Sequence, residues 1–249
     1  MIFRRGKKKG VEEDTFQPET ELGAEADLGD IDEAAGGDDP ASDETAAFDP
    51  DALDARSWRS EGPYDVTEAD LEEDPVEGRP RIDLGSMIVT GFPGAELRLQ
   101  VSEETSQIVS AMLISGNSAL ELGAYAAPRS GGLWAELRDD LIEGATEAGG
   151  SATLVEGPFG VELRRLLPVT TPEGEEGYQP SRMWVVEGPR WLLRGIVYGQ
   201  AALEEGVEPP VAELLTAYKQ VIVRRGDEAM APGDLLPLSM PENLVAADD

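Results

Sequence analysis

The sequence has 249 residues, of which 51 are acidic and 20 basic, and its net charge is −31. It contains neither cysteine nor histidine. This excludes disulfides, thiol catalysis, the usual zinc ligands and every mechanism that needs an imidazole. So acidic a chain is also a poor general binder of nucleic acid, because such binding requires cations that neutralise phosphates.

The first 80 residues divide into two oppositely charged parts. Residues 1–10 carry five basic and no acidic residues, whereas residues 11–80 carry 25 acidic and three basic ones. Because residues 11–80 have few large apolar side chains, we expect residues 1–80 to form a disordered arm. For the basic head, contact with nucleic acid or an anionic membrane, contact with the acidic arm, and plain solvation all remain open. The aromatic residues within the arm are either docking motifs or scattered side chains: Phe16, Phe48, Trp58 and Tyr64.

From residue 81 the composition and the apolar pattern change to those of a folded domain, which we expect to span residues 81–241. Residues 81–90 contain a short apolar run, and residues 96–101 and 118–126 alternate between apolar and polar side chains. Together with the apolar run at residues 107–115, they predict an antiparallel meander of strands. From Leu133 the apolar residues recur with helical spacing until Gly149, which predicts an amphipathic helix. On this helix Arg138 is expected to lie on the polar face.

The loop that opens this helix is the first candidate site. Its residues are Arg129, Ser130, Gly131 and Gly132. In one interpretation, the free N–H groups of the helix start and the Arg129 guanidinium bind a phosphate or carboxylate. In the other, the loop is a plain strand-to-helix connection in which Ser130 caps the helix.

The second half of the domain predicts more strands and one more helix. We expect strands at residues 152–155 and 161–169, a polar loop at 170–180, and a hairpin formed by residues 182–187 and 190–198. A second amphipathic helix should start at Pro209, followed by a β-branched strand at residues 221–225. Residues 235–238 should pack on the core, and residues 242–249 form an acidic tail. The predicted fold is a single α+β domain with a mainly antiparallel, twisted sheet and two principal amphipathic helices.

Arginines on the predicted strands form the second candidate site: Arg164, Arg165, Arg182, Arg190 and Arg194. Arg190 and Arg194 should share one face of their strand, with Trp191 on the other face. Together with Arg129 they would build a basic pocket for an anionic molecule or an acidic peptide. The alternative is that these arginines pair with neighbouring glutamates. Three tryptophans are expected mainly in the core, because each buries a large apolar area: Trp134, Trp184 and Trp191.

Several short motifs form a recurring set along residues 80–241. They are residues 125–134 (YAAPRSGGLW), 155–160 (VEGPFG), 188–194 (GPRWLLR), 230–232 (MAP) and 236–238 (LPL). As a set they resemble an actinobacterial family classified only as a domain of unknown function, DUF3710. The resemblance implies a cytoplasmic actinobacterial protein and supplies no activity, cofactor or catalytic residue.

These observations favour a non-enzymatic interaction or regulatory module in which the acidic arm docks a protein partner or masks the domain itself. The alternative is a domain that binds a small anionic ligand through Arg129 and the Gly131–Gly132 helix start. An enzyme is the third hypothesis, for which we name no catalytic residue, metal or cofactor. The sequence contains neither a secretory signal nor a run of about 18 apolar residues, so we expect a cytoplasmic protein without a transmembrane segment.

Overall fold

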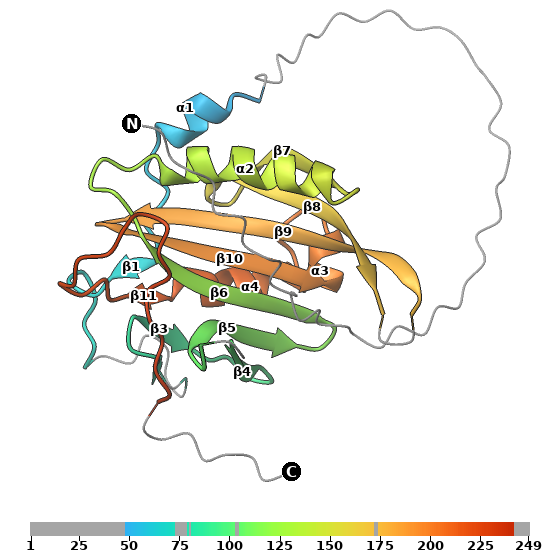
Figure 1. The fold of residues 1–249 in the computed structure, drawn as a ribbon. Coiled ribbons are helices and arrows are strands. Elements are labelled where there is room, and N and C mark those ends of the chain that lie inside the picture. Colours follow the sequence, from blue (N-terminus) through green and yellow to red (C-terminus); the bar gives the residue numbers. More distant parts are fainter. Residues whose placement is uncertain (1–47, 73–78, 80, 103–104, 172–173, 242–249) are drawn as a thin grey trace, which may run out of the picture.

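The computed structural model describes residues 48–72, 79, 81–102, 105–171 and 174–241. Its centre is a seven-stranded antiparallel sheet with the strand order β4-β5-β6-β10-β9-β8-β7 (Figure 1). In that order the strands span Glu96–Val101, Ile108–Ser115, Ser118–Ala126, Trp191–Gly199, Glu176–Gly188, Gly160–Thr170 and Ser151–Gly157. The predicted alternating strands β4 and β6 are confirmed at the predicted bounds.

A smaller sheet of four strands has the order β1-β11-β3-β2. These strands span Tyr64–Asp65, Ile222–Val223, Met87–Thr90 and Arg81–Asp83. β1 runs parallel to β11, and the other pairs are antiparallel. Strands were predicted at residues 81–90 and 221–225, where β2, β3 and β11 lie, but β1 and the pairing of these strands in a separate sheet were not predicted, because pairing depends on contacts between distant segments.

Four helices are described, α1 at Pro50–Asp54, α2 at Leu133–Glu147, α3 at Gln200–Leu203 and α4 at Val211–Lys219. The two longest, α2 and α4, are the amphipathic helices expected from the sequence. α2 packs across β7, β8 and β9 on one face of the large sheet (Figure 1). The opposite face packs against α3, α4, the small sheet and residues 236–238. The predicted α+β fold class is therefore confirmed.

The core has two parts because the large sheet is buried on both faces. Along β9, Met183 and Val185 pack in the cluster beneath α2, whereas Trp184 and Val186 pack in the cluster on the opposite face. Side chains of a strand alternate between faces, so one strand supplies both clusters. The predicted burial of the three tryptophans is confirmed, with exposures of 7%, 1% and 0% for Trp134, Trp184 and Trp191.

The segment at residues 48–72 belongs to the fold, although the sequence analysis placed it in the disordered arm. Asp49 caps α1 by accepting hydrogen bonds from the backbone N–H groups of residues 51 and 52. The buried Asp65 carboxylate accepts a 2.8 Å hydrogen bond from the Trp191 indole. The average composition of residues 11–80 does not reveal this packing, because only a few large side chains, such as Trp58, contact the core from an otherwise acidic segment. The rest of the predicted arm up to residue 47, and the predicted acidic tail at residues 242–249, lie outside the described residues.

An ion pair also joins α1 to α2. Arg138 is buried and its Nη1 atom lies 2.7 Å from Asp54 Oδ2. The expectation that Arg138 lies on the solvent face of α2 was therefore wrong, since α1 covers this side chain.

Two further expectations concern loops. The polar loop predicted at residues 170–180 is shorter, because Gly174 adopts a positive φ of 87° in a tight turn and β9 already begins at Glu176. The expected packing of residues 235–238 on the core is confirmed: Leu236 is fully buried and its N–H donates to the Ala124 carbonyl at 2.8 Å.

Candidate functional site

The loop that opens α2 is exposed and is built from two left-handed glycines. Gly131 has φ 70° and Gly132 has φ 88°, a region in which residues with a Cβ atom are strained. Gly132 is the N-cap, and no side chain caps the helix from this position. The Ser130 hydroxyl lies 3.4 Å from the Gly131 carbonyl instead. The predicted Ser130 cap is therefore wrong, because the chain enters the helix through a left-handed residue that turns Ser130 away.

A carboxylate from β9 takes the position expected for an anion. Glu187 Oε1 accepts a 2.7 Å hydrogen bond from the backbone N–H of Trp134, in the first turn of α2. A methyl group added at Gly131 would lie 3.5 Å from the other oxygen of Glu187, so the carboxylate lies directly against the loop. A helix N-terminus attracts negative charge. This protein satisfies that attraction with its own side chain, and a second anion there would be repelled by Glu187.

The predicted arginines lie apart from one another. Arg129 is exposed on the loop, and Arg190 is close to it through its backbone, since the Ala127 N–H donates to the Arg190 carbonyl at 2.9 Å. The Arg190 side chain turns away and donates to the Gly226 carbonyl at 2.9 Å. Arg194 lies further along β10, where its Nη2 atom is 3.3 Å from Glu121 Oε1. The structure thus brings the four loop residues and the Arg190 backbone together, and it places Arg194 in a different cluster.

Arg194, Glu121, Tyr125 and Tyr198 form a cluster, the Arg194 cluster, on the face of the sheet that carries α2. Its guanidinium lies 5.2 Å from the centre of the Tyr125 ring, and the Tyr198 hydroxyl donates to Glu121 Oε2 at 3.1 Å. Burial raises the pKa of the Tyr125 hydroxyl, an effect that the charge of Arg194 partly opposes. The alternative that strand arginines pair with glutamates therefore describes Arg194 correctly.

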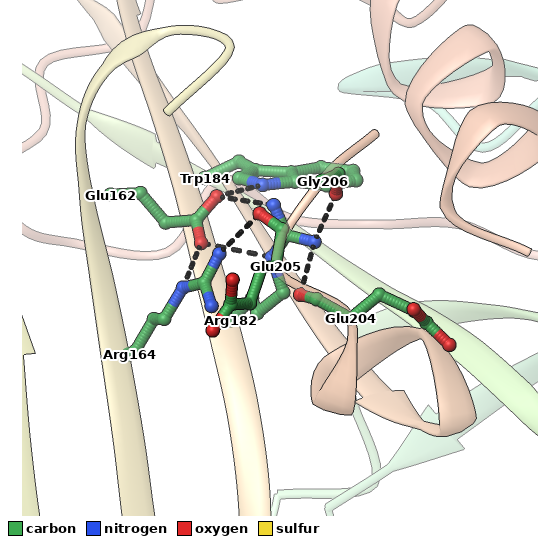
Figure 2. A network of polar contacts seen from close by, with 7 residues as sticks. All are labelled: Glu162, Arg164, Arg182, Trp184, Glu204, Glu205 and Gly206. Carbon is green, nitrogen blue, oxygen red and sulfur yellow. Dashed lines mark hydrogen bonds and ion pairs between the residues drawn. The ribbon is translucent and has the colours of Figure 1, made fainter. Parts of the chain in front are cut away.

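A second cluster, on the opposite face, centres on the buried carboxylate of Glu162 (Figure 2). Arg164 pairs with Arg182 across β8 and β9, and Glu162 and Trp184 lie two residues further along the same face. The carboxylate accepts four hydrogen bonds, which come from Arg164 Nε at 2.8 Å, Arg182 Nε at 2.9 Å, Arg182 Nη2 at 3.0 Å and Trp184 Nε1 at 2.8 Å. Each oxygen thus accepts two bonds, which leaves no acceptor position for a proton-transfer role.

The same arginines hold the loop that follows α3. Arg182 Nη1 donates to the carbonyls of Glu204 at 3.0 Å and Gly206 at 2.7 Å, and Arg164 Nη2 donates to the carbonyl of Glu205 at 2.8 Å (Figure 2). Three consecutive backbone carbonyls are thereby fixed against the sheet. The cluster is a structural clamp that positions residues 203–207 beside the hairpin formed by β8 and β9.

That hairpin extends beyond its neighbours in the sheet (Figure 1). The pairing of β8 with β7 ends at Leu166, and the pairing of β9 with β10 ends at Arg182. The outer part is a two-stranded ribbon in which Leu166 pairs with Pro180 and Pro168 with Tyr178. Because partners in an antiparallel pair point to the same face, these four side chains form one apolar stripe.

The stripe lies next to the clamped loop, because Leu166 and Pro180 are two residues from Arg164 and Arg182, which hold the loop on the same face. Eight described large apolar side chains are exposed, and four of them lie here: Leu166 (40%), Tyr178 (61%), Leu203 (69%) and Val207 (43%). We call this area the hairpin surface and define it by Leu166, Pro168, Tyr178, Pro180, Leu203 and Val207. Exposed apolar patches on soluble domains commonly mark interaction sites.

The rim of the hairpin surface is acidic. The described residues of 166–181 and 203–210 include no lysine or arginine. They include five glutamates: Glu175, Glu176, Glu204, Glu205 and Glu208. A binding partner therefore meets an apolar centre with negative charge around it. Within the described part of the chain, no group of three or more potential ligands is arranged to hold a metal ion.

Comparison with known proteins gives the family. The model of the family described as "Protein of unknown function (DUF3710)" matches residues 62–247. The chain belongs to the DUF3710 family. The match begins within the segment that the structure adds to the fold, before residue 81. Among solved structures, this DUF3710 protein is similar to cyanobacterial PsbP (CyanoP) from Synechocystis sp. PCC 6803, determined in solution. The two share 11% identity at a TM-score of 0.35, over 62% of this chain and 98% of that one.

No curated protein matches the sequence of this DUF3710 member. Its described helices include none that is long and apolar enough to cross a membrane. The alternative that the strand arginines pair with glutamates also describes Arg164 and Arg182 correctly. Sequence reasoning missed the partners Glu187, Glu121 and Glu162, since each of these contacts depends on strand register. The one local signal was the pattern Glu-Leu-Arg at residues 162–164, which places a carboxylate and a guanidinium on the same face of a strand.

Proposed function

We propose that this protein is a non-enzymatic interaction module that binds a protein partner through the hairpin surface. The observation that carries the proposal is the concentration there of four of the eight exposed large apolar side chains. The best-formed polar clusters support it as well, because Glu162 and Glu187 already bind groups of the chain itself. In the actinobacterial cytoplasm that the family resemblance implies, such a partner would be another cytoplasmic protein.

The geometry of the ribbon suits this role. Beyond Leu166 and Arg182 each strand has an outer edge whose backbone groups are directed away from the large sheet. An extended segment of a partner can add to such an edge while its apolar side chains cover the stripe. The Glu162 clamp keeps Leu203 and Val207 in place, so the surface is already formed before binding.

The test uses the tagged full chain as bait in a lysate of the source organism. Tyr178→Ser is expected to abolish the recovery of co-purifying proteins that the wild type retains. Val101→Ser is the matched control, because Val101 is a comparably exposed strand residue (54%) outside the hairpin surface. Equal recovery with both variants would show that the hairpin surface is not the docking site.

The alternative, an anionic-ligand site at Arg129 and the helix start, is less well supported. Glu187 already occupies the N-terminus of α2, and an added phosphate would meet its charge. A thermal-shift series with phosphate and small carboxylates tests this alternative. A stabilisation that is lost in Arg129→Ala would restore it.

A further inference from the structure

The hairpin surface combines an apolar centre with an acidic rim, and one segment of this chain has the complementary pattern. Residues 1–10 read MIFRRGKKKG, in which three apolar residues precede five cations and no acid occurs. We propose that this head binds the hairpin surface of its own chain and masks it from partners. The inference rests on the proposed function, because it names what competes with the partner for the same surface.

The positive charge of the head favours it as the segment that binds the hairpin surface. Lys219 is the only lysine outside the head, so the head holds the densest positive charge in a chain of net charge −31. Five cations face a rim of five described glutamates, which are matched by no cation within the same residues. Such pairing between exposed groups is screened by salt, with a Debye length of about 8 Å at physiological ionic strength. Salt should therefore release the head.

The apolar residues of the head determine where on the domain the head binds. Acidic residues occur all over this chain, so charge alone would let the head bind in many places. The side chains of Ile2 and Phe3 need an apolar partner, and the hairpin surface holds half of the exposed large apolar side chains that are described. Burial of apolar area therefore favours this surface over the acidic remainder.

The connecting segment is long enough. Residues 11–47 separate the head from the described part of the chain, which begins just before α1. An extended chain of this length spans about 120 Å at most. A compact domain of about 200 residues has a radius of gyration of only about 16 Å. α1 packs against β7 and β8, and Trp58 lies against Gly160 at the start of β8, so the arm begins at the end of the sheet opposite the hairpin tip and has to span the domain to reach it. Tethering gives an effective concentration in the millimolar range, so a weak intrinsic affinity suffices.

The experiment uses the full chain, whose lack of cysteine allows two to be placed at will. One variant carries Gly6→Cys with Thr170→Cys, at the exposed end of the apolar stripe. The control carries Gly6→Cys with Asp140→Cys, an exposed position on α2 at the opposite face of the sheet. A short bismaleimide is added at low micromolar protein concentration, and the cross-linked monomer is quantified by mass spectrometry. We expect at least fivefold faster linking to position 170, and loss of this preference at 1 M salt or when Phe3→Ser is added.

Other outcomes would overturn the proposal. Equal rates for positions 170 and 140 would show that the head does not prefer the hairpin surface. Linking between two chains, rising with concentration, would assign the surface to a second copy. Binding of the head to anionic lipid vesicles, with position 170 linked no faster than position 140, would assign the head to a membrane.

The inference and the proposed function fail separately. If cross-linking shows no preference for position 170 but Tyr178→Ser abolishes partner recovery, the hairpin surface binds a partner and the head does not mask that surface. A preference for position 170 with unchanged recovery in Tyr178→Ser would leave the head bound and reject the partner site. If both hold, reversing the charge of the three lysines at residues 7–9 should raise partner recovery several-fold.

Discussion

The contribution of the buried ion pair at Glu162 to the free energy of unfolding can be compared with that of an exposed pair of the same local geometry. In both Glu162–Arg164 on β8 and Glu96–Arg98 on β4, the arginine follows two residues later and its Nε atom lies 2.8 Å from glutamate Oε1. The side chain of Glu162 is 1% exposed, whereas that of Glu96 is 59% exposed. The substitutions Glu162→Gln and Glu96→Gln therefore remove the same charge from the same local arrangement at two depths.

Burial sets the expected difference in the free energy of unfolding. Glutamine keeps the size of the side chain but replaces one acceptor oxygen by an N–H donor that faces the donors of Arg182 and Trp184. Arg182 would then keep its charge in the interior without its counter-ion. Removing one partner of a buried pair costs about 3–5 kcal/mol, a large share of a typical stability of about 5–15 kcal/mol. At Glu96 water replaces the lost contact, so Glu96→Gln should unfold at nearly the wild-type urea concentration.

Urea unfolding followed by tryptophan fluorescence and by circular dichroism measures both variants. Two probes are needed because Trp184 belongs to the cluster, so its fluorescence can change without a change in stability. Amide exchange in residues 203–210 should rise in Glu162→Gln, since the clamp that holds the carbonyls of Glu204 and Gly206 is weakened. Equal midpoints for the two variants would refute the claim that burial decides the strength of these pairs.

Two further substitutions test single contacts. Glu187→Ala removes the acceptor of the Trp134 N–H, and loss of such a cap should cost about 0.5–2 kcal/mol. It should also let sulfate raise the thermal midpoint of the variant but not of the wild type, and an equal rise in both would show that Glu187 does not fill the helix start. Tyr218→Phe keeps the buried ring and removes a hydroxyl that donates to the Leu193 carbonyl at 2.9 Å, at a cost of about 1 kcal/mol at pH 7. Burial raises the pKa of Tyr218 well above 10.0, so its contribution is complete below pH 10 and is lost at higher pH, where the unfolded chain ionises first. Urea unfolding at pH 7 and 11 should show the wild-type advantage shrinking, and a constant difference would contradict it.

Local periodicity allowed much of the large sheet to be predicted. β4 and β6 have the predicted bounds because the alternation of their side chains is complete within each strand. The predicted start of α2 at Leu133 is also confirmed, since its apolar residues repeat with helical spacing over four turns. In each case the information lies within 6 to 15 consecutive residues. These are the lengths over which a pattern of period 2 or 3.6 can be recognised.

What could not be predicted depends on residues far apart in the chain. Trp134 and its cap Glu187 are separated by 53 residues, and Asp65 and Trp191 by 126. No local pattern indicates that the start of a helix will lie beside the end of a particular strand. The helix start thus indicates N–H groups that attract an anion, but the sequence does not reveal that the Glu187 carboxylate accepts the hydrogen bond from the Trp134 N–H.

The distribution of charge links the fold to the proposed partner. Several arginines are paired with carboxylates from distant parts of the chain, as in Arg138 with Asp54, Arg182 with Glu162, and Arg224 with Asp83. Each such pair holds two segments together and takes one cation out of the reach of a partner. The chain has 31 more acidic than basic residues, so one-to-one pairing leaves most of its carboxylates without a cation. A partner for the hairpin surface must then supply apolar side chains together with cations, because a neutral apolar segment would leave the glutamate rim uncompensated and an acidic one would be repelled. Residues 1–10 meet the same requirement, so we expect the head and the partner to compete for the hairpin surface.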